Sequence, residues 1–146
     1  MISVNEALEA LLGLTQPIGA ETIPLAQASG RVLAKHALAD RDQPPFPASA
    51  MDGYALASER AKPGAEFTVI GESAAGHGFT SPVSTGQCVR IFTGAPVPEG
   101  CDRVIIQEDV TRSGDTIKLN ENLDPAHYVR AKGFDFKRGS SLDAPK

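Results

Sequence analysis

An aspartate behind a proline-rich stretch is the first residue of this sequence whose surroundings suggest chemistry. Pro44, Pro45 and Pro47 are followed closely by Asp52-Gly53. Proline fixes φ and removes a backbone donor, so the approach is predicted to be extended and stiff. Glycine accepts a positive φ, so Asp52-Gly53 is predicted to form a tight turn that presents the carboxylate in one place. The same pattern is also typical of a proline-rich linker that ends in an ordinary turn.

A hydroxyl, a glycine and a proline come together in a second stretch, Thr93-Gly94-Ala95-Pro96. A hydroxyl followed by glycine allows backbone N–H groups to come close to an oxyanion, and the proline holds the loop in shape. The alternative is a rigid loop that joins two strands.

Basic residues surround Asp135 in the sequence; they are Arg130, Lys132, Lys137 and Arg138. Such a group can balance the charge of a phosphate, or it can simply solvate a surface.

The N-terminal stretch predicts a helix from Ser3 to Leu14. Ser3 and Glu6 have the spacing of a capping box, and apolar residues recur every three or four positions. Gly13 and Pro17 are expected to end the helix. Its apolar stripe can pack on a core or against a second subunit.

The next residues predict little regular structure. An extended segment is expected at Glu21 to Leu25, a helical turn at Leu25 to Ser29 closed by Gly30, and a strand at Arg31 to Ala39.

From Tyr54 onward the chain is predicted to be mainly β, which makes the fold class α+β. Strands are expected at Glu66 to Ile70, Cys88 to Phe92 and Arg103 to Gln107, with a hairpin around Ser113-Gly114-Asp115. The glycine-rich segment Gly71 to Gly78, which contains His77, is predicted to be a mobile loop. Short strands with Gly or Pro at nearly every junction favour a compact, barrel-like or sandwich β module.

Composition excludes several classes of protein. The 146 residues include 14 basic and 18 acidic side chains, a net charge of −4, which argues against a nucleic-acid-binding protein. No apolar run approaches the roughly 18 residues of a membrane span, and the N-terminus has no signal-peptide pattern, so a cytoplasmic protein without a membrane partner is expected. Cys88 and Cys101 are expected to stay reduced, and the histidines have no zinc-site spacing.

Four blocks of the sequence resemble, in order, the motifs of one enzyme family, the molybdopterin molybdenumtransferases and their gephyrin relatives. The blocks span 23–34, 44–55, 90–100 and 128–139, and the second reads PPFPASAMDGYA. Pro47-Ala48 stands where the family commonly has Asp-Asn, and Phe134 where it has an acidic or small residue.

The resemblance implies a domain organisation. Residues 1–45 would be the first part of a dimerisation domain, residues 46–137 an inserted β module that carries site residues, and residues 138–146 the start of a return segment. The family continues into a nucleotide- and pterin-binding α/β domain, which nothing here resembles. The chain is therefore interpreted as the N-terminal part of a longer homodimeric protein, and is expected to be inactive alone.

The resemblance also implies a reaction, the insertion of molybdenum from molybdate into adenylylated molybdopterin with release of AMP. Both substrates are anions, so the site is expected to use cations, N–H donors and a divalent metal such as Mg²⁺ held by carboxylates. By resemblance, the catalytic residues are Asp52, Thr93 and Asp135, the metal ligands Asp52 and Asp135, and the cofactor-binding residues Ser49, Gly94 and Arg130. They are expected to complete the active site of the partner subunit.

Two other functions fit parts of the pattern. One is a non-catalytic scaffold or binding module of the gephyrin type, and the other is an unrelated β module whose Pro-Gly loops bind a peptide. The presence of Asp52, Thr93 and Asp135 favours the transferase over the peptide binder. A pterin-binding domain downstream of Lys146 would favour the transferase over the scaffold.

Overall fold

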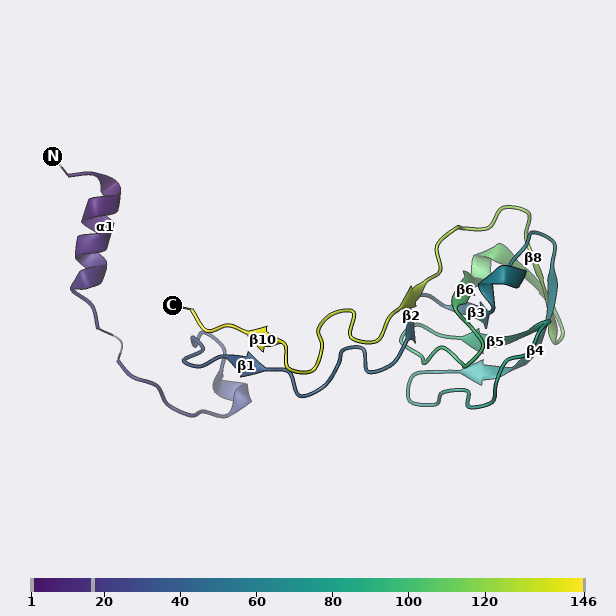
Figure 1. Ribbon diagram of the computed structural model, residues 1–146, viewed down its shortest axis with the longest axis horizontal. Helices are drawn as coiled ribbons and strands as arrows, with labels where there is room; N and C mark the ends of the chain where they lie inside the picture. The colour runs from purple at the N-terminus through teal and green to yellow at the C-terminus, as the bar shows by residue number, and fades with distance from the viewer. Residues whose placement is uncertain (1, 17, 146) are drawn as a thin grey trace. The chain divides into compact units, whose positions relative to one another are not determined.

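The chain divides into two compact units (Figure 1). The structure is a computed structural model that describes residues 2–16 and 18–145. Unit 1 is Met1–Ala37 with Leu142–Lys146, and unit 2 is Leu38–Ser141. No helix within the described ranges is both long and apolar enough to cross a membrane.

Helix α1 (Val4–Gly13) is the main element of unit 1. The predicted capping box is confirmed, because the Glu6 N–H donates to the Ser3 hydroxyl at 3.2 Å and the Ser3 N–H donates to the Glu6 carboxylate at 2.7 Å. None of the residues of α1 is buried.

The predicted helical turn is also confirmed as the 3₁₀ turn η1 (Leu25–Gln27). The strand predicted from Arg31 to Ala39 is wrong except at its end, where β1 is Ala37–Leu38. At its start, the Arg31 N–H donates to the Ala28 carbonyl at 3.1 Å and so continues the turn rather than a ladder.

Unit 2 is built on a six-stranded sheet in the order β6-β3-β5-β4-β8-β7. The strands are β3 (Gly53–Leu56), β4 (Glu66–Ser73), β5 (Gln87–Ile91), β6 (Arg103–Ile106), β7 (Val110–Ser113) and β8 (Thr116–Leu119). Pairing is antiparallel except between β4 and β5. The sheet curls on itself, as Figure 1 shows, which confirms the predicted mainly β, barrel-like module.

Alternation along the strands places apolar side chains on both faces of this sheet. Tyr54 and Leu56 of β3 pack with Phe67 and other residues in one cluster, whereas Ala55 packs with Ile91 in a second cluster. Successive residues of a strand point to opposite faces, so a strand buried on both faces must be apolar throughout.

The hairpin predicted around Gly114 is confirmed as β7 and β8, with Gly114 at a φ of 58°. The loop predicted from Gly71 to Gly78 is wrong at its start, because β4 continues to Ser73 opposite Ile91 after a bulge between Val69 and Glu72. The remaining residues form a tight turn closed by the Ala74–His77 bridge.

Two short ladders complete the pairing. They are β1 with β10 (Ser141–Leu142), and β2 (Ala48–Ser49) with β9 (Val129–Arg130). Between them, Gln43 bridges Phe136, so the segments before β2 and after β9 run side by side (Figure 1). The prediction of an extended proline stretch is wrong from Pro44 to Phe46, where the chain bends and the Pro44 carbonyl accepts the Gly133 N–H at 2.8 Å.

Candidate functional site

Asp52 lies at the end of the six-stranded sheet, directly before β3. The predicted glycine turn is wrong, because Gly53 is a strand residue without a positive φ. A Cβ atom at position 53 would lie 2.0 Å from the carbonyl oxygen of Ile105 in β6. Glycine is therefore required here, because the neighbouring strand comes so close. That close approach also fixes the backbone directly after Asp52.

Two donors from Thr93 hold the Asp52 carboxylate. The Thr93 N–H donates to Oδ1 at 2.7 Å and the Thr93 hydroxyl donates to the same oxygen at 2.8 Å. The Thr93 N–H and then its hydroxyl hold the pKa of Asp52 below its usual range. Burial opposes them, and the nearby charge of Arg90 lowers the pKa by the smallest of the four effects. Asp52 is thus an ionised carboxylate with one oxygen fixed, and within the described residues Oδ2 receives no hydrogen bond.

In the loop after β5, the backbone N–H groups form hydrogen bonds with other groups of the chain. The Thr93 N–H goes to Asp52, the Gly94 N–H donates to the Ser49 carbonyl at 2.8 Å, and the Ala95 N–H donates to the Phe92 carbonyl at 2.9 Å. These donors bind groups of the chain itself, one of which is the Asp52 carboxylate, and the loop therefore presents that carboxylate. Its expected contact with an oxyanion of a substrate stays a prediction.

Ser49 holds the same loop from the other side. Its side chain is buried and its hydroxyl donates to the Met51 carbonyl at 2.6 Å, while its N–H donates to the Ala95 carbonyl at 2.9 Å. Ser49 and Gly94 thus tie β2 to the loop that carries Thr93. Their expected contact with the cofactor stays a prediction.

Arg90 of β5 completes this end of the sheet, and sequence reasoning did not single it out. Its guanidinium donates to the Gly53 carbonyl at 3.2 Å and to the Gln107 side chain at 2.8 Å. The only sequence signal was its place in the block that also contains Thr93.

Asp135 belongs to a second polar group, after β9. Its carboxylate pairs with the Arg130 guanidinium, which also lies over the Phe134 ring, and its N–H donates to the Gln43 carbonyl at 2.9 Å. Arg130 and Asp135, both predicted as site residues, are therefore brought together.

Asp42 anchors this second group and was missed. It accepts the Arg138 N–H at 2.8 Å, and its other oxygen lies 3.5 Å from the Lys132 ammonium. The Arg138 N–H is the main cause of the lowered pKa of Asp42, with a smaller effect of Lys132. Asp42 lies two residues before Pro44, and nothing in that spacing distinguished it.

The described side chains do not by themselves make a magnesium site. Within them, no group of three or more His, Cys, Asp or Glu residues is placed to hold a metal ion. The Asp52 carboxylate accepts hydrogen bonds from Thr93, and the Asp135 carboxylate forms an ion pair with Arg130. The expected magnesium site at Asp52 and Asp135 remains a prediction.

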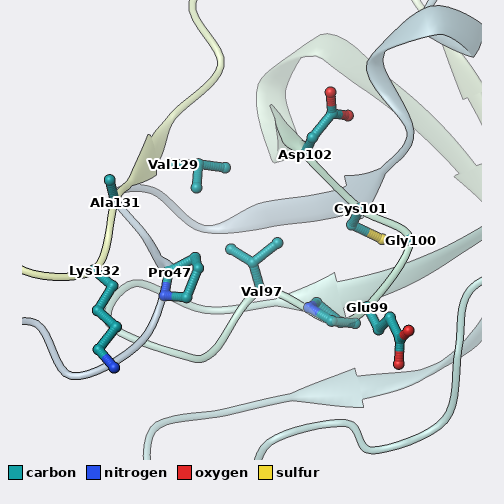
Figure 2. Close-up of a pocket in the computed structure, with 10 residues that line it drawn as sticks. Pro47, Val97, Glu99, Gly100, Cys101, Asp102, Val129, Ala131 and Lys132 are labelled. Carbon is teal, nitrogen blue, oxygen red and sulfur yellow. The ribbon is translucent and has the colours of Figure 1, made fainter.

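A cavity of about 450 Å³ lies elsewhere in unit 2 (Figure 2). Pro47, Val97 and Val129 form its apolar wall, with Lys132 and Cys101 at its sides. Burial raises the pKa of both free thiols, Cys101 and Cys88, to about 12, so they are poor nucleophiles. None of the predicted site residues lines this cavity.

Comparison with known proteins agrees with the motif analysis. The family model of the MoeA N-terminal region (domain I and II) matches residues 2–145. The molybdopterin molybdenumtransferase of Haemophilus influenzae is 36% identical over 141 residues, covering 95% of this chain and 35% of the relative. That of Synechocystis sp. is 37% identical over 146 residues, covering 97% of this chain and 37% of the relative.

A solved structure shows the same fold. The crystal structure of the molybdopterin biosynthesis MoeA protein from Pyrococcus horikoshii OT3 matches with a TM-score of 0.81 at 36% identity, over 96% of this chain and 39% of that one. The chain therefore spans little more than a third of the length of the relatives it matches.

Proposed function

The chain belongs to the family of MoeA N-terminal regions, domains I and II, and on that premise we propose that it is part of a molybdopterin molybdenumtransferase of molybdenum cofactor biosynthesis. The proposed reaction inserts molybdenum from molybdate into adenylylated molybdopterin and releases AMP. The relatives' name supports the reaction class.

The fixed carboxylate of Asp52 is the observation that carries this proposal. Two donors on Oδ1 leave Oδ2 as an acceptor whose direction is set by the sheet. Because the pKa of Asp52 is lowered, the group is a weak base at neutral pH. Its proposed role is therefore to hold a hydrogen-bond donor of the substrate or a cation that accompanies it, rather than to take up a proton.

The second polar group supplies positive charge for the anionic substrates. Among Arg130, Lys132, Lys137 and Arg138, two cations are paired with Asp135 and Asp42, so the group keeps an excess of positive charge. Positive side chains attract phosphate and molybdate, and a planar guanidinium binds an oxyanion through two parallel bonds. We propose that Arg130 contacts the pterin phosphate, with Asp135 fixing its orientation.

The working form is proposed to be a homodimer in which these residues face the partner's pterin site. Helix α1 supports this, because Leu8, Leu11 and Leu12 on its apolar stripe are 53%, 62% and 61% exposed. An exposed apolar face of this kind is typical of an interaction surface.

The test is molybdate-dependent release of AMP from adenylylated molybdopterin by the complete enzyme that contains this chain. We expect AMP and molybdenum cofactor to form in equal amounts. A complete, folded protein that neither binds adenylylated molybdopterin nor releases AMP would contradict the proposal.

A further inference from the structure

The Arg90 guanidinium connects three elements at the end of the sheet that carries Asp52. Its Nη1 donates to the carbonyl of Gly53 in β3 at 3.2 Å, and its Nη2 donates to the Gln107 side-chain oxygen at 2.8 Å. Gln107 begins the 3₁₀ turn η3 (Gln107–Asp109) that follows β6. The guanidinium thus bridges β5, β3 and η3.

Two aromatic rings hold the guanidinium in this place. Its Cζ atom lies 5.2 Å from the centre of the Tyr54 ring and 4.8 Å from that of the Phe92 ring. Tyr54 is the cross-strand partner of Arg90, and Phe92 lies two residues further along, so the three side chains share one face. An arginine between two rings has few other rotamers, because its planar group stacks on both.

Arg90 reaches Asp52 through the backbone on both of its sides. The Gly53 carbonyl that Arg90 binds belongs to the residue directly after Asp52. The Gln107 N–H donates to the carbonyl of Asp52 itself at 3.2 Å, and Arg90 holds the Gln107 side chain. Thr93 fixes the Asp52 carboxylate. Arg90 binds both the Gly53 carbonyl and the Gln107 side chain, and so connects the two contacts that fix the Asp52–Gly53 backbone.

We propose that Arg90 is the positioning residue of this site, whose guanidinium locks the Asp52–Gly53 backbone against Gln107 so that the Asp52 carboxylate keeps one direction. Its value for catalysis rests on the function proposed above, but its effect on Asp52 does not. Lysine cannot replace it, because an ammonium has no planar fork that spans two acceptors between two rings.

The experiment compares Arg90→Gln and Arg90→Lys in this chain by NMR, with Arg112→Gln as a matched control. Arg112 is an exposed arginine of β7 that binds the Gly114 carbonyl, away from this end of the sheet. The two readouts are the pKa of the Asp52 carboxyl and the hydrogen-exchange rate of the Thr93 amide, which reports the bond to Oδ1.

Both Arg90 variants should speed exchange of the Thr93 amide by about tenfold, the effect of weakening one hydrogen bond to a charged group. The pKa of Asp52 should rise toward the ordinary aspartate value in Arg90→Gln and less in Arg90→Lys, since lysine restores the charge and not the fork. Arg112→Gln should change neither quantity.

The inference would be overturned if both Arg90 variants fold and keep the wild-type pKa of Asp52 and the wild-type exchange rate of the Thr93 amide. It would also be overturned if Arg112→Gln changed these two quantities as much as the Arg90 variants do. If Arg90→Gln does not fold, Gln107→Ala serves instead, because it removes only the side-chain acceptor of the Arg90 guanidinium. It should still speed exchange of the Thr93 amide, and an unchanged exchange rate in this variant would also overturn the inference. These readouts need no substrate. A positive NMR result combined with a complete, folded enzyme that releases no AMP from adenylylated molybdopterin would contradict the proposed function alone.

Discussion

At the scale of single residues, the proposed function should depend on the negative charge of Asp52. In the complete enzyme, Asp52→Ala and Asp52→Asn should both lower the rate of molybdenum insertion by about a hundredfold, the typical effect of losing a charged group at a reacting centre. Asparagine keeps the shape and loses the charge, so its failure would assign the effect to charge. Insertion rate is to be measured in parallel with thermal unfolding.

His77→Ala is the control for this pair, because His77 is exposed in the turn after β4 and, within the described residues, its side chain makes no hydrogen bond or ion pair. It should leave insertion unchanged. Normal insertion by the Asp52 variants, or a loss that only follows a loss of folded protein, would contradict the role of Asp52.

Thr93 should set the pH range in which that charge is present. The folded-state pKa of Asp52 is lowered mainly by Thr93, so the ionised form persists as the pH falls and is lost only when the pH passes through this lowered pKa. Thr93→Val removes the hydroxyl donor and keeps the N–H, so the pKa of Asp52 should rise. The acid limb of the pH–rate profile of insertion should then move to higher pH.

Thr93→Ser keeps both donors and is the matched control for the acid limb. An acid limb in the same place for valine and serine would mean that Asp52 does not govern the pH dependence of insertion.

At the scale of elements, the contact between β3 and β6 should tolerate only glycine at position 53. Gly53→Ala places a Cβ atom 2.0 Å from the Ile105 carbonyl oxygen, so one strand must move. Overpacking of this kind costs about 3 kcal/mol or more when backbone atoms clash. Urea unfolding of this chain should show that loss of stability. The position of the Asp52 carboxylate should change with it.

Gly13→Ala is the comparison substitution, because a Cβ at the end of α1 meets nothing within 4 Å. It should be neutral or raise the free energy of unfolding by less than about 1 kcal/mol. Equal stability of the two variants would mean that the strands adjust freely, and would contradict the close approach.

Local patterns predicted those elements whose cause is local. The capping box at Ser3 and the glycine turn at Gly114 each depend on residues a few positions apart, and both formed as expected. The end of β4 depends on pairing with β5, and the need for Gly53 depends on β6. Neither can be seen from neighbouring residues, so one was predicted as a loop and the other as a turn.

The site, like the fold, was predicted in part. Motif resemblance chose Asp52, Thr93, Arg130 and Asp135, and the structure pairs them as Asp52 with Thr93 and Arg130 with Asp135. It could not predict that the N–H groups of the Thr93 loop are used internally. Arg90 and Asp42 were missed because they act through backbone groups of distant segments, which leave no pattern in the sequence.

At the scale of the whole molecule, helix α1 should contribute to self-association of the complete enzyme. Leu8→Gln combined with Leu12→Gln removes apolar area from its exposed stripe while keeping good helix formers. The dimer dissociation constant, measured by sedimentation equilibrium, should rise at least about tenfold, since the lost burial weakens association. Glu9→Gln on the same helix should leave it unchanged.

This chain by itself should associate weakly, because α1 is too small to hold two copies together. A ten-residue helix is only about 15 Å long, whereas a stable interface buries roughly 1,600 Å² in total. We expect a monomer or a weak dimer for the 146 residues at low micromolar concentration, and a firm dimer for the complete enzyme. Sedimentation velocity on both decides the point: a tight dimer of this chain alone that survives the two leucine substitutions would mean that another surface of these residues makes the interface.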